Sequence, residues 1–143
     1  MTTVYFDSSA FVKLLLVEEG GQLAADLWDG CDVAVAGRLA YPEVKAALAA
    51  AARSGRVGRS RSTSASAEWS SLWNDVRPVE FGLSVEQVAG ECAERFALTG
   101  ADAVHLASAL ALGDPSVIVA TWDRRLAVAA LRAGLSVVPA PAA

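Results

Sequence analysis

Residues 4–11 have the sequence VYFDSSAF, which indicates where a buried strand ends and a helix begins. Val4, Tyr5 and Phe6 form a short run typical of a buried strand, and Asp7 follows it directly. The residues behind it, SSAFVKLLL, carry apolar side chains as a helix does, with no Gly or Pro turn in between. In open parallel sheets each strand passes into a helix at its carboxyl end, which is where ligands bind. We therefore expect Asp7 to lie at such an edge.

The rest of the chain repeats this alternation of strand and helix. Short β-branched or apolar runs are separated by longer stretches with apolar residues at helical spacing. The runs are TVYF (3–6), DVAVAG (32–37), VRPVEF (76–81), SVIVAT (116–121) and LSVVP (135–139). This rhythm predicts one α/β domain over residues 1–143, with a mainly parallel five-stranded sheet flanked by helices.

Several helix starts can be recognised in the sequence. TGAD (99–102) and SVEQ (84–87) both match a capping box, and Pro42 suits a first helical turn. The stretch RSGRVGRSRSTSASAEWSSLW (53–73) is polar and serine-rich first and helical later. We interpret it as a mobile, arginine-bearing connection that leads into a helix whose two tryptophans belong to the core.

Composition excludes several classes of protein. No apolar run approaches the roughly 18 residues that span a bilayer, and no basic segment precedes an apolar stretch at the N-terminus, so we expect a soluble, cytoplasmic protein without a membrane partner. Cys31 and Cys92 are isolated and His105 is the single histidine, which indicates neither a zinc site nor a disulfide framework. The chain also lacks the GxSxG and GxxxxGK[ST] motifs of serine hydrolases and P-loop proteins.

Four carboxylates fall at strand ends or helix starts. Asp7 ends the first strand, and Glu43 lies in the first turn of the alanine-rich helix that follows VAVAGRLAYP. Asp102 opens the helix TGADAVHLASAL, and Asp123 stands two residues past VIVAT. Because these positions can share the carboxyl edge of one parallel sheet, we expect the four side chains to form one site.

Each acid also has an ordinary structural explanation. Asp123 can cap the next helix, Asp102 can complete its capping box, and Glu43 can complement a helix dipole. Asp7 fits that explanation less well, because two serine hydroxyls behind it offer other caps. Clustered carboxylates repel one another and are stable together only beside a cation. Oxygen ligands alone favour magnesium or manganese over zinc.

Four motifs together carry a family resemblance. They are VYFDSSAFVKLLL, YPEVKAAL, GADAVHLASAL and VATWDRRL, and in this order they resemble the PIN-domain ribonucleases, specifically the toxins of VapBC toxin–antitoxin pairs. The resemblance runs from residue 4 to about residue 138. It implies a five-stranded parallel sheet, homodimerisation, and inhibition by a cognate antitoxin that places an arginine among the acids.

The resemblance also implies roles for individual residues. The catalytic acids and ligands of Mg²⁺ or Mn²⁺ would be Asp7, Glu43, Asp102 and Asp123. Ser9 would orient the first aspartate, with Thr121 as a second supporting residue. The role of His105 is less fixed, and a partly buried structural histidine is an equal alternative. The implied activity is metal-dependent endoribonuclease cleavage of RNA phosphodiester bonds.

The formal net charge of −4 is unfavourable for an RNA-binding protein. However, setting aside the four proposed ligands among the 16 acids leaves as many acids as the 12 basic residues. A candidate RNA-binding group lies downstream of the Glu43 helix: Arg53, Arg56, Arg59 and Arg61. Solvated loop charges or antitoxin contacts are the alternatives for this group.

Other functions on the same fold class fit less well. A phosphoacceptor receiver domain needs a lysine near its last strands, whereas Lys13 and Lys45 are the only lysines and lie early. A haloacid-dehalogenase-like phosphatase needs a second acid two residues after the first, where this chain has Ser9. A catalytically silent RNA- or antitoxin-binding module remains the alternative, and a metal-dependent RNA cleavage assay would separate it from an enzyme.

Overall fold

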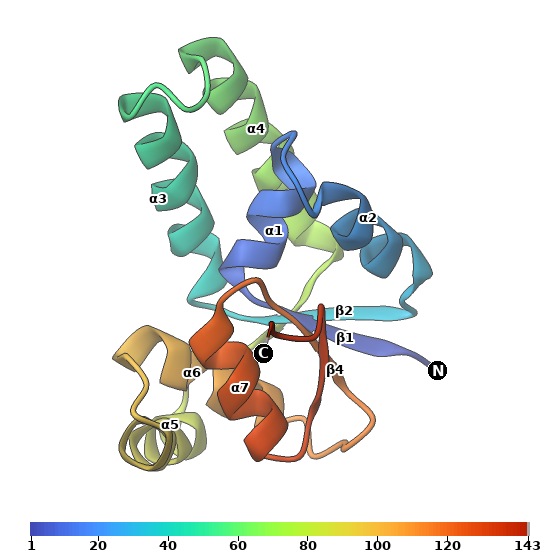
Figure 1. Cartoon of the computed structure of the whole chain (residues 1–143), viewed down its shortest axis with the longest axis vertical. Helices are drawn as coiled ribbons and strands as arrows, with labels where there is room; N and C mark the ends of the chain where they lie inside the picture. The colour runs from blue at the N-terminus through green and yellow to red at the C-terminus, as the bar shows by residue number, and fades with distance from the viewer. Residues whose placement is uncertain (143) are drawn as a thin grey trace.

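The computed structural model describes residues 1–142. Five strands within this range form one sheet (Figure 1). All four strand pairs are parallel, and the strand order is β3-β2-β1-β4-β5. The strands are β1 (Thr3–Phe6), β2 (Val33–Gly37), β3 (Arg77–Val79), β4 (Ile118–Ala120) and β5 (Ser136–Val138). Each lies within one of the five predicted runs, so the predicted fold class is confirmed.

Helices cover both faces of the sheet. They are α1 (Ser8–Leu15), α2 (Gly21–Gly30), α3 (Ala40–Arg53), α4 (Arg59–Leu72), a 3₁₀ turn η1 (Trp73–Asp75), α5 (Leu83–Phe96), α6 (Gly100–Leu110) and α7 (Arg124–Arg132). Helices α1 to α4 lie on one side of the sheet and α5 to α7 on the other (Figure 1). Among residues 1–142, no helix has the length and apolar character that a membrane span requires.

The central strand β1 serves both hydrophobic cores. Val4 and Phe6 pack into the core shared with α1, α3 and α4, whereas Tyr5 packs into the core shared with α5, α6 and α7. Successive side chains of a strand point to opposite faces, so a strand covered on both faces must be apolar at every position. This explains why an uninterrupted apolar run, and not an alternating pattern, precedes Asp7.

Trp69 is the largest fully buried side chain. Its ring centroid lies 4.6 Å from that of Phe11 and 6.0 Å from that of Tyr41. Its Nε1–H donates to the backbone oxygen of Tyr41 at 3.1 Å, so the polar atom is satisfied inside the core. The tryptophan therefore fastens α4 to α1 and to the start of α3.

The prediction of a mobile connection after α3 is wrong for its serine-rich half. Helix α4 already begins at Arg59, which leaves only residues 54–58 between the two helices. The small side chains let α4 pack closely on α3, and the Ser62 hydroxyl donates to the Leu48 oxygen at 3.0 Å. Lys45 Nζ likewise donates to the Ser66 oxygen at 2.9 Å. Such contacts satisfy polar groups that the sequence pattern assigns to solvent.

The two predicted capping boxes differ in outcome. Thr99 is the N-cap of α6, and its hydroxyl accepts from the Asp102 amide at 3.3 Å. The second box is wrong, because α5 begins at Leu83 with Gly82 as its N-cap, so Ser84 already lies inside the helix. Pro42 lies in the first turn of α3, as predicted.

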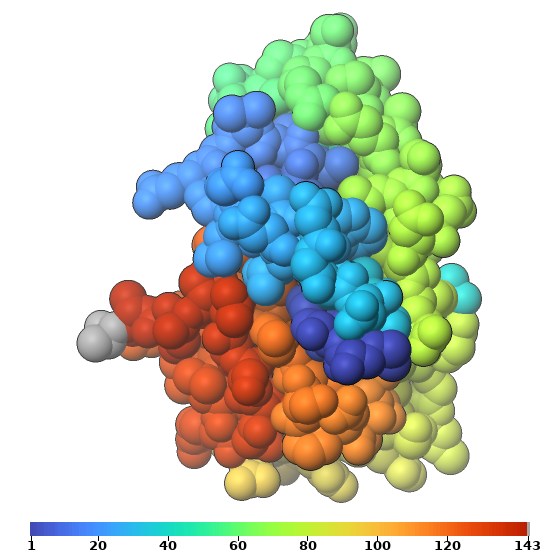
Figure 2. All heavy atoms as spheres, turned by 90° about the vertical axis from the view of Figure 1, so that its right-hand side faces the viewer, coloured from blue at the N-terminus to red at the C-terminus, as the bar shows by residue number. Residues whose placement is uncertain are grey.

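The amino ends of β1 and β2 are tied together at the edge opposite the predicted site. The Thr2 amide donates to Asp32 Oδ2 at 2.6 Å, and the Asp32 amide donates to the Thr2 oxygen at 2.8 Å. Figure 2 shows the start of the chain packed against the residues that follow α2. These two bonds join the amino ends of the central strands, and the predicted site lies at the opposite, carboxyl edge of the sheet.

Candidate active site

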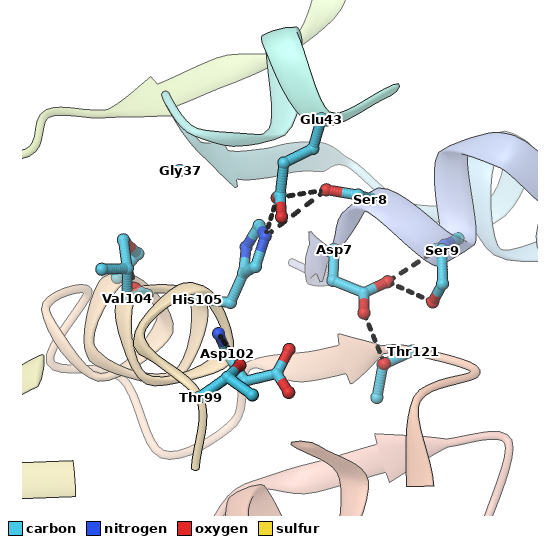
Figure 3. Close-up of polar contacts among 12 residues, drawn as sticks. Asp7, Ser8, Ser9, Gly37, Glu43, Thr99, Asp102, Val104, His105 and Thr121 are labelled. Atoms are coloured by element: carbon cyan, nitrogen blue, oxygen red, sulfur yellow. Dashed lines mark hydrogen bonds and ion pairs between the residues drawn. The ribbon is translucent and has the colours of Figure 1, made fainter. Parts of the chain in front are cut away.

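Asp7 is a buried carboxylate at the junction of β1 and α1, with 4% of its surface exposed. As the N-cap of α1, it accepts on Oδ1 from the Ala10 amide at 3.0 Å and from the Ser9 hydroxyl at 2.6 Å. Its Oδ2 accepts from the Thr121 hydroxyl at 2.6 Å (Figure 3). Burial raises the pKa of Asp7 above its ordinary value, although the hydrogen bonds from Ser9 and Thr121 oppose that rise.

Ser9 and Thr121 connect this carboxylate to the segment between β4 and α7. The Ser9 hydroxyl accepts from the Trp122 amide at 2.9 Å, and the Thr121 hydroxyl accepts from the Asp123 amide at 3.0 Å. Each hydroxyl therefore both donates to Asp7 and accepts from the backbone. This arrangement fixes the orientation of Asp7 and places Asp123 close by.

Glu43 is held from two sides. Its Oε1 lies 2.5 Å from the Ser8 hydroxyl and 2.5 Å from His105 Nε2, and the side chain is 29% exposed. Partial burial raises the pKa of Glu43, but the hydrogen bonds from His105 and Ser8 outweigh it and bring the pKa below its ordinary value. Burial lowers the pKa of His105, but the bond to Glu43 together with the charges of Asp7, Glu43 and Asp102 outweighs burial, so that pKa lies above its ordinary value.

Tyr5 fixes the other side of the His105 ring. The Gly37 amide donates to Tyr5 Oη at 3.0 Å, and Oη lies 2.8 Å from His105 Nδ1. Burial raises the pKa of Tyr5, so the phenol keeps its proton. Since the Glu43 carboxylate is an acceptor, the ring proton on Nε2 points at Glu43, and this proton is present in both the neutral and the charged imidazole. A chain of hydrogen bonds thus runs from the backbone of β2 to Glu43.

Replacing Tyr5 with Phe is expected to destabilise the protein by about 1–3 kcal/mol, because the buried Gly37 amide loses its acceptor. Urea unfolding measures this change. Tyr41→Phe is the matched control, since its half-buried hydroxyl contacts only the Ser70 hydroxyl, at 3.2 Å. Equal losses of unfolding free energy in the two variants would show that the bond from the Gly37 amide to the Tyr5 hydroxyl does not stabilise the fold.

Asp102 and Asp123 lie at the starts of α6 and α7. Partial burial and then the charge of Asp123 raise the pKa of Asp102, so these two acids interact. Asp123 is also the N-cap of α7, where its Oδ1 accepts from the Leu126 amide at 3.0 Å. The capping explanation thus holds for Asp123 and for Asp7, but it does not compete with a site, because both caps lie at the same edge of the sheet.

Three of the four predicted acids surround His105 at the carboxyl edge of the sheet, and the fourth, Asp123, lies near Asp102. Figure 3 shows Asp7, Glu43 and Asp102 on different sides of the imidazole, and all three raise its pKa. However, within residues 1–142 no three His, Cys, Asp or Glu side chains are arranged to hold a metal ion. Asp7 and Glu43 instead turn toward hydroxyl and imidazole partners. Coordination of one ion by all four acids stays a prediction.

The four predicted RNA-binding arginines lie far from these acids. Arg53 ends α3, ten residues and roughly 15 Å along the helix from Glu43. Arg56 pairs with Glu18 at 3.9 Å. Arg61 pairs with Glu68 at 3.2 Å and also donates to the Leu15 backbone oxygen, so it links α4 to the end of α1. Arg61 therefore has a structural role that the sequence pattern does not reveal.

Sequence reasoning missed Tyr5 and Ser8 as parts of the site. Both lie within the opening stretch VYFDSSAF, where Tyr5 has the appearance of a core residue and Ser8 that of a spare helix cap. The available signal was the two-residue period of β1, which directs Tyr5 toward the face that α6 and its histidine cover. The partner itself, 100 residues away, follows only from the tertiary structure.

Comparison with known proteins identifies the family. The PIN domain model matches residues 4–131. Two proteins from different strains of Mycobacterium tuberculosis, named Ribonuclease VapC45 and Ribonuclease VapC49, are each 59% identical to this chain over 140 residues. Each alignment covers 98% of this chain and 97% of the relative.

Solved structures share the fold at lower identity. PAE2754 from Pyrobaculum aerophilum superposes with a TM-score of 0.71 at 22% identity, over 96% of this chain and 84% of that chain. VapC20 of Mycobacterium tuberculosis, described as a sarcin-ricin loop cleaving toxin, superposes with a TM-score of 0.66 at 20% identity, over 88% of this chain and 94% of its own. The chain therefore belongs to the PIN-domain family, and within it to the VapC type.

Proposed function

We propose that this protein is a metal-dependent endoribonuclease and the toxin of a toxin–antitoxin pair. The observation that carries the proposal is the gathering of Asp7, Glu43, Asp102 and Asp123 at one sheet edge, in a chain 59% identical to two proteins named ribonuclease. Hydrolysis of an RNA phosphodiester bond is the reaction that such an acidic edge supports once its charge is balanced by a cation.

The donor set fits magnesium or manganese. All four proposed ligands are carboxylates, and the repulsion between Asp102 and Asp123, which raises the pKa of Asp102, is what a bound cation would relieve. A divalent ion held by Asp7, Glu43, Asp102 and Asp123 would supply an activated water and stabilise negative charge on the scissile phosphate.

The other residues of the site act on the proposed ligands. Ser9 and Thr121 fix both oxygens of Asp7, so this carboxylate needs no reorganisation before it acts. Ser8 and His105 hold one oxygen of Glu43, and no hydrogen bond within residues 1–142 occupies the other. His105 is a positioning residue in this proposal, since it acts through Glu43.

The proposed partners follow from the VapBC resemblance. They are an RNA substrate, a cognate antitoxin, and a second copy of this chain in a homodimer, all in the cytoplasm. An alternative function, a silent binding module, is favoured by one observation: no three described side chains are arranged as metal ligands. The experiment below separates these possibilities.

Adding Mg²⁺ or Mn²⁺ is expected to switch on RNA cleavage and to stabilise the fold by about 2.7 kcal/mol at 100 times the dissociation constant. Asp102→Asn should lose both effects, because it removes a proposed ligand. Asp26→Asn is the control, since Asp26 lies exposed on α2 and contacts only Gln22. Cleavage assays and thermal unfolding with and without EDTA give the two readouts. Undiminished cleavage in EDTA would contradict metal dependence, whereas a metal-induced stabilisation without any cleavage would support the silent module.

A further inference from the structure

A basic hollow lies beside the acids and has no part in the site described above. It is a cavity of about 390 Å³ between the end of α5 and the exposed face of α7. Phe96 lines it from α5, and Arg124, Arg125 and Arg132 line it from α7. None of these residues belongs to the proposed ligand set or to the arginines at the α3–α4 end of the molecule.

The arginines around this hollow have no acidic partners. Arg95, Arg124, Arg125 and Arg132 are all exposed, and no salt bridge within residues 1–142 involves any of them. In a chain with a net charge of −4, four unpaired cations in one place form a distinct local positive surface. Such a surface is complementary to a polyanion and not to the rest of this protein.

Two of these arginines also stand where helix electrostatics disfavours them. Arg124 and Arg125 are the first two residues of α7, whose first turn holds no acid. The amino end of a helix carries a partial positive charge, so cations there lower the stability of the helix. The Asp123 carboxylate at the N-cap offsets part of this cost, and an anionic ligand bound beside the two arginines would offset more of it.

Phe96 adds an aromatic element to the hollow. The guanidinium carbons of Arg95 and Arg132 lie 5.0 Å and 5.3 Å from its ring centroid, so both cations are oriented by the ring face. Unstacked bases of single-stranded RNA bind on aromatic rings and on guanidinium planes of this kind, while free guanidinium groups contact the phosphates. The combination of ring and cations favours single-stranded RNA over a simple anion.

The residues that line the hollow are close in sequence to two of the acids. Asp123 caps α7 directly before Arg124, and Phe96 lies six residues before Asp102. A strand whose scissile phosphate reaches the acids would therefore pass over the start of α7 into the hollow. The group around Arg53 lies instead at the far end of α3 (Figure 1).

We propose that the hollow formed by Phe96, Arg124, Arg125 and Arg132 binds the segment of single-stranded RNA next to the scissile bond. The arginines contact its phosphates, and a flanking base stacks on the guanidinium planes that lie over the Phe96 ring. This assignment rests on the proposed ribonuclease function and names the path of the substrate from that site.

The test compares two triple variants with the same loss of charge. One is Arg124→Gln with Arg125→Gln and Arg132→Gln. The control is Arg53→Gln with Arg56→Gln and Arg59→Gln, which spares the structural Arg61. Binding of a labelled single-stranded RNA in EDTA is followed by fluorescence anisotropy from 50 to 200 mM salt. We expect the hollow variant to bind at least about tenfold more weakly, with a salt slope reduced by about 2, or about 0.7 for each lost phosphate contact. The control should keep both values.

Phe96→Leu separates stacking from charge. It should weaken RNA binding without changing the salt slope, because no counterion contact is lost. In cleavage assays with Mn²⁺, the hollow variant should raise KM about tenfold and keep kcat within about threefold, since the acids are untouched. Its thermal midpoint should equal or exceed that of the wild type, because cations leave the amino end of α7.

Failure of this assignment is distinct from failure of the ribonuclease proposal. If the wild type cleaves RNA and the hollow variant keeps the wild-type RNA affinity and salt slope, the assignment of the hollow is wrong and the ribonuclease proposal stands. A changed salt slope of RNA binding in the Arg53, Arg56 and Arg59 variant alone would place the RNA along α3 and overturn the assignment of the hollow. A hollow variant that loses antitoxin binding but keeps RNA binding would also overturn it. RNA binding through the hollow without cleavage in either metal supports the hollow and contradicts the nuclease.

Discussion

Asp7→Asn is expected to abolish RNA cleavage while leaving the metal-free protein at least as stable as the wild type. Loss of a metal ligand removes several kcal/mol of transition-state stabilisation, which corresponds to a rate loss of about 10³-fold or more. The asparagine oxygen can still accept from the Ala10 amide and from Ser9, so the cap of α1 is kept, while the amide nitrogen donates to the Thr121 hydroxyl in place of the bond it replaces. Removing the buried charge should then raise stability by about 0.5–2 kcal/mol at neutral pH.

This gain in stability should depend on pH with a definite sign. Because burial raises the pKa of Asp7 in the folded state, the unfolded chain loses this proton first as the pH rises above the ordinary value of 3.8. Wild-type stability falls through that window until the folded pKa is passed, and Asn has no such loss. The difference between variant and wild type should therefore be near zero below pH 3.8, grow as the pH rises, and then level off.

Urea unfolding in EDTA at a series of pH values measures this difference. Asp26→Asn is again the matched control, since it removes an exposed carboxylate that bonds only to Gln22. Marked unfolding of Asp7→Asn at every pH would mean that the aspartate serves the fold as a cap and hydrogen-bond acceptor. Retained cleavage by the folded variant would remove Asp7 from the catalytic set.

Trp69→Ala is expected to cost about 3–5 kcal/mol of unfolding free energy, the largest stability effect of any single change considered for this chain. The side chain is fully buried among Phe11, Tyr41 and Trp73, and its loss leaves a cavity that α1, α3 and α4 cannot close by small shifts. Because Tyr41 precedes Glu43 by two residues in α3, the same variant should also misplace Glu43 and reduce cleavage.

Trp73→Ala is the control for this prediction, because Trp73 is half-buried and belongs to the 3₁₀ turn after α4. Chemical denaturation followed by circular dichroism should show a clearly smaller loss for Trp73→Ala. Similar losses for both variants would mean that the aromatic cluster stabilises the fold as a whole and that Trp69 has no special place in it.

The strands were predictable because a parallel sheet covered on both faces leaves a strong local signal. Residues 4–6 and 117–120 are apolar at every position, and each run lies in or around one observed strand. The serine-rich start of α4 could not be recognised, because its stability comes from tertiary contacts of Ser62 and Lys45 with α3 and α4. The start of α5 was misplaced because a glycine cap has no side-chain signal.

For the site, positions were predictable and contacts were not. Each acid could be placed at a strand end or helix start from local patterns alone, and that is where Asp7, Asp102 and Asp123 lie. The bond between His105 and Glu43 joins residues 62 positions apart and depends on how α3 and α6, from opposite faces of the sheet, meet at its carboxyl edge. No sequence period or motif encodes a hydrogen bond between residues so far apart, so the orientation of each carboxylate follows only from the structure.

The bonds that fix Asp7 also set when this site can exist. Thr121 and the Trp122 amide reach Asp7 and Ser9 from 114 and 113 positions away in the sequence. At a synthesis rate of about 5–20 residues per second, roughly 6–23 s separate the appearance of the first half of this constellation from the second. A growing chain on the ribosome therefore lacks the completed site until nearly all of it has emerged. For every molecule made, that interval passes before Asp7 has its full set of hydrogen-bond donors.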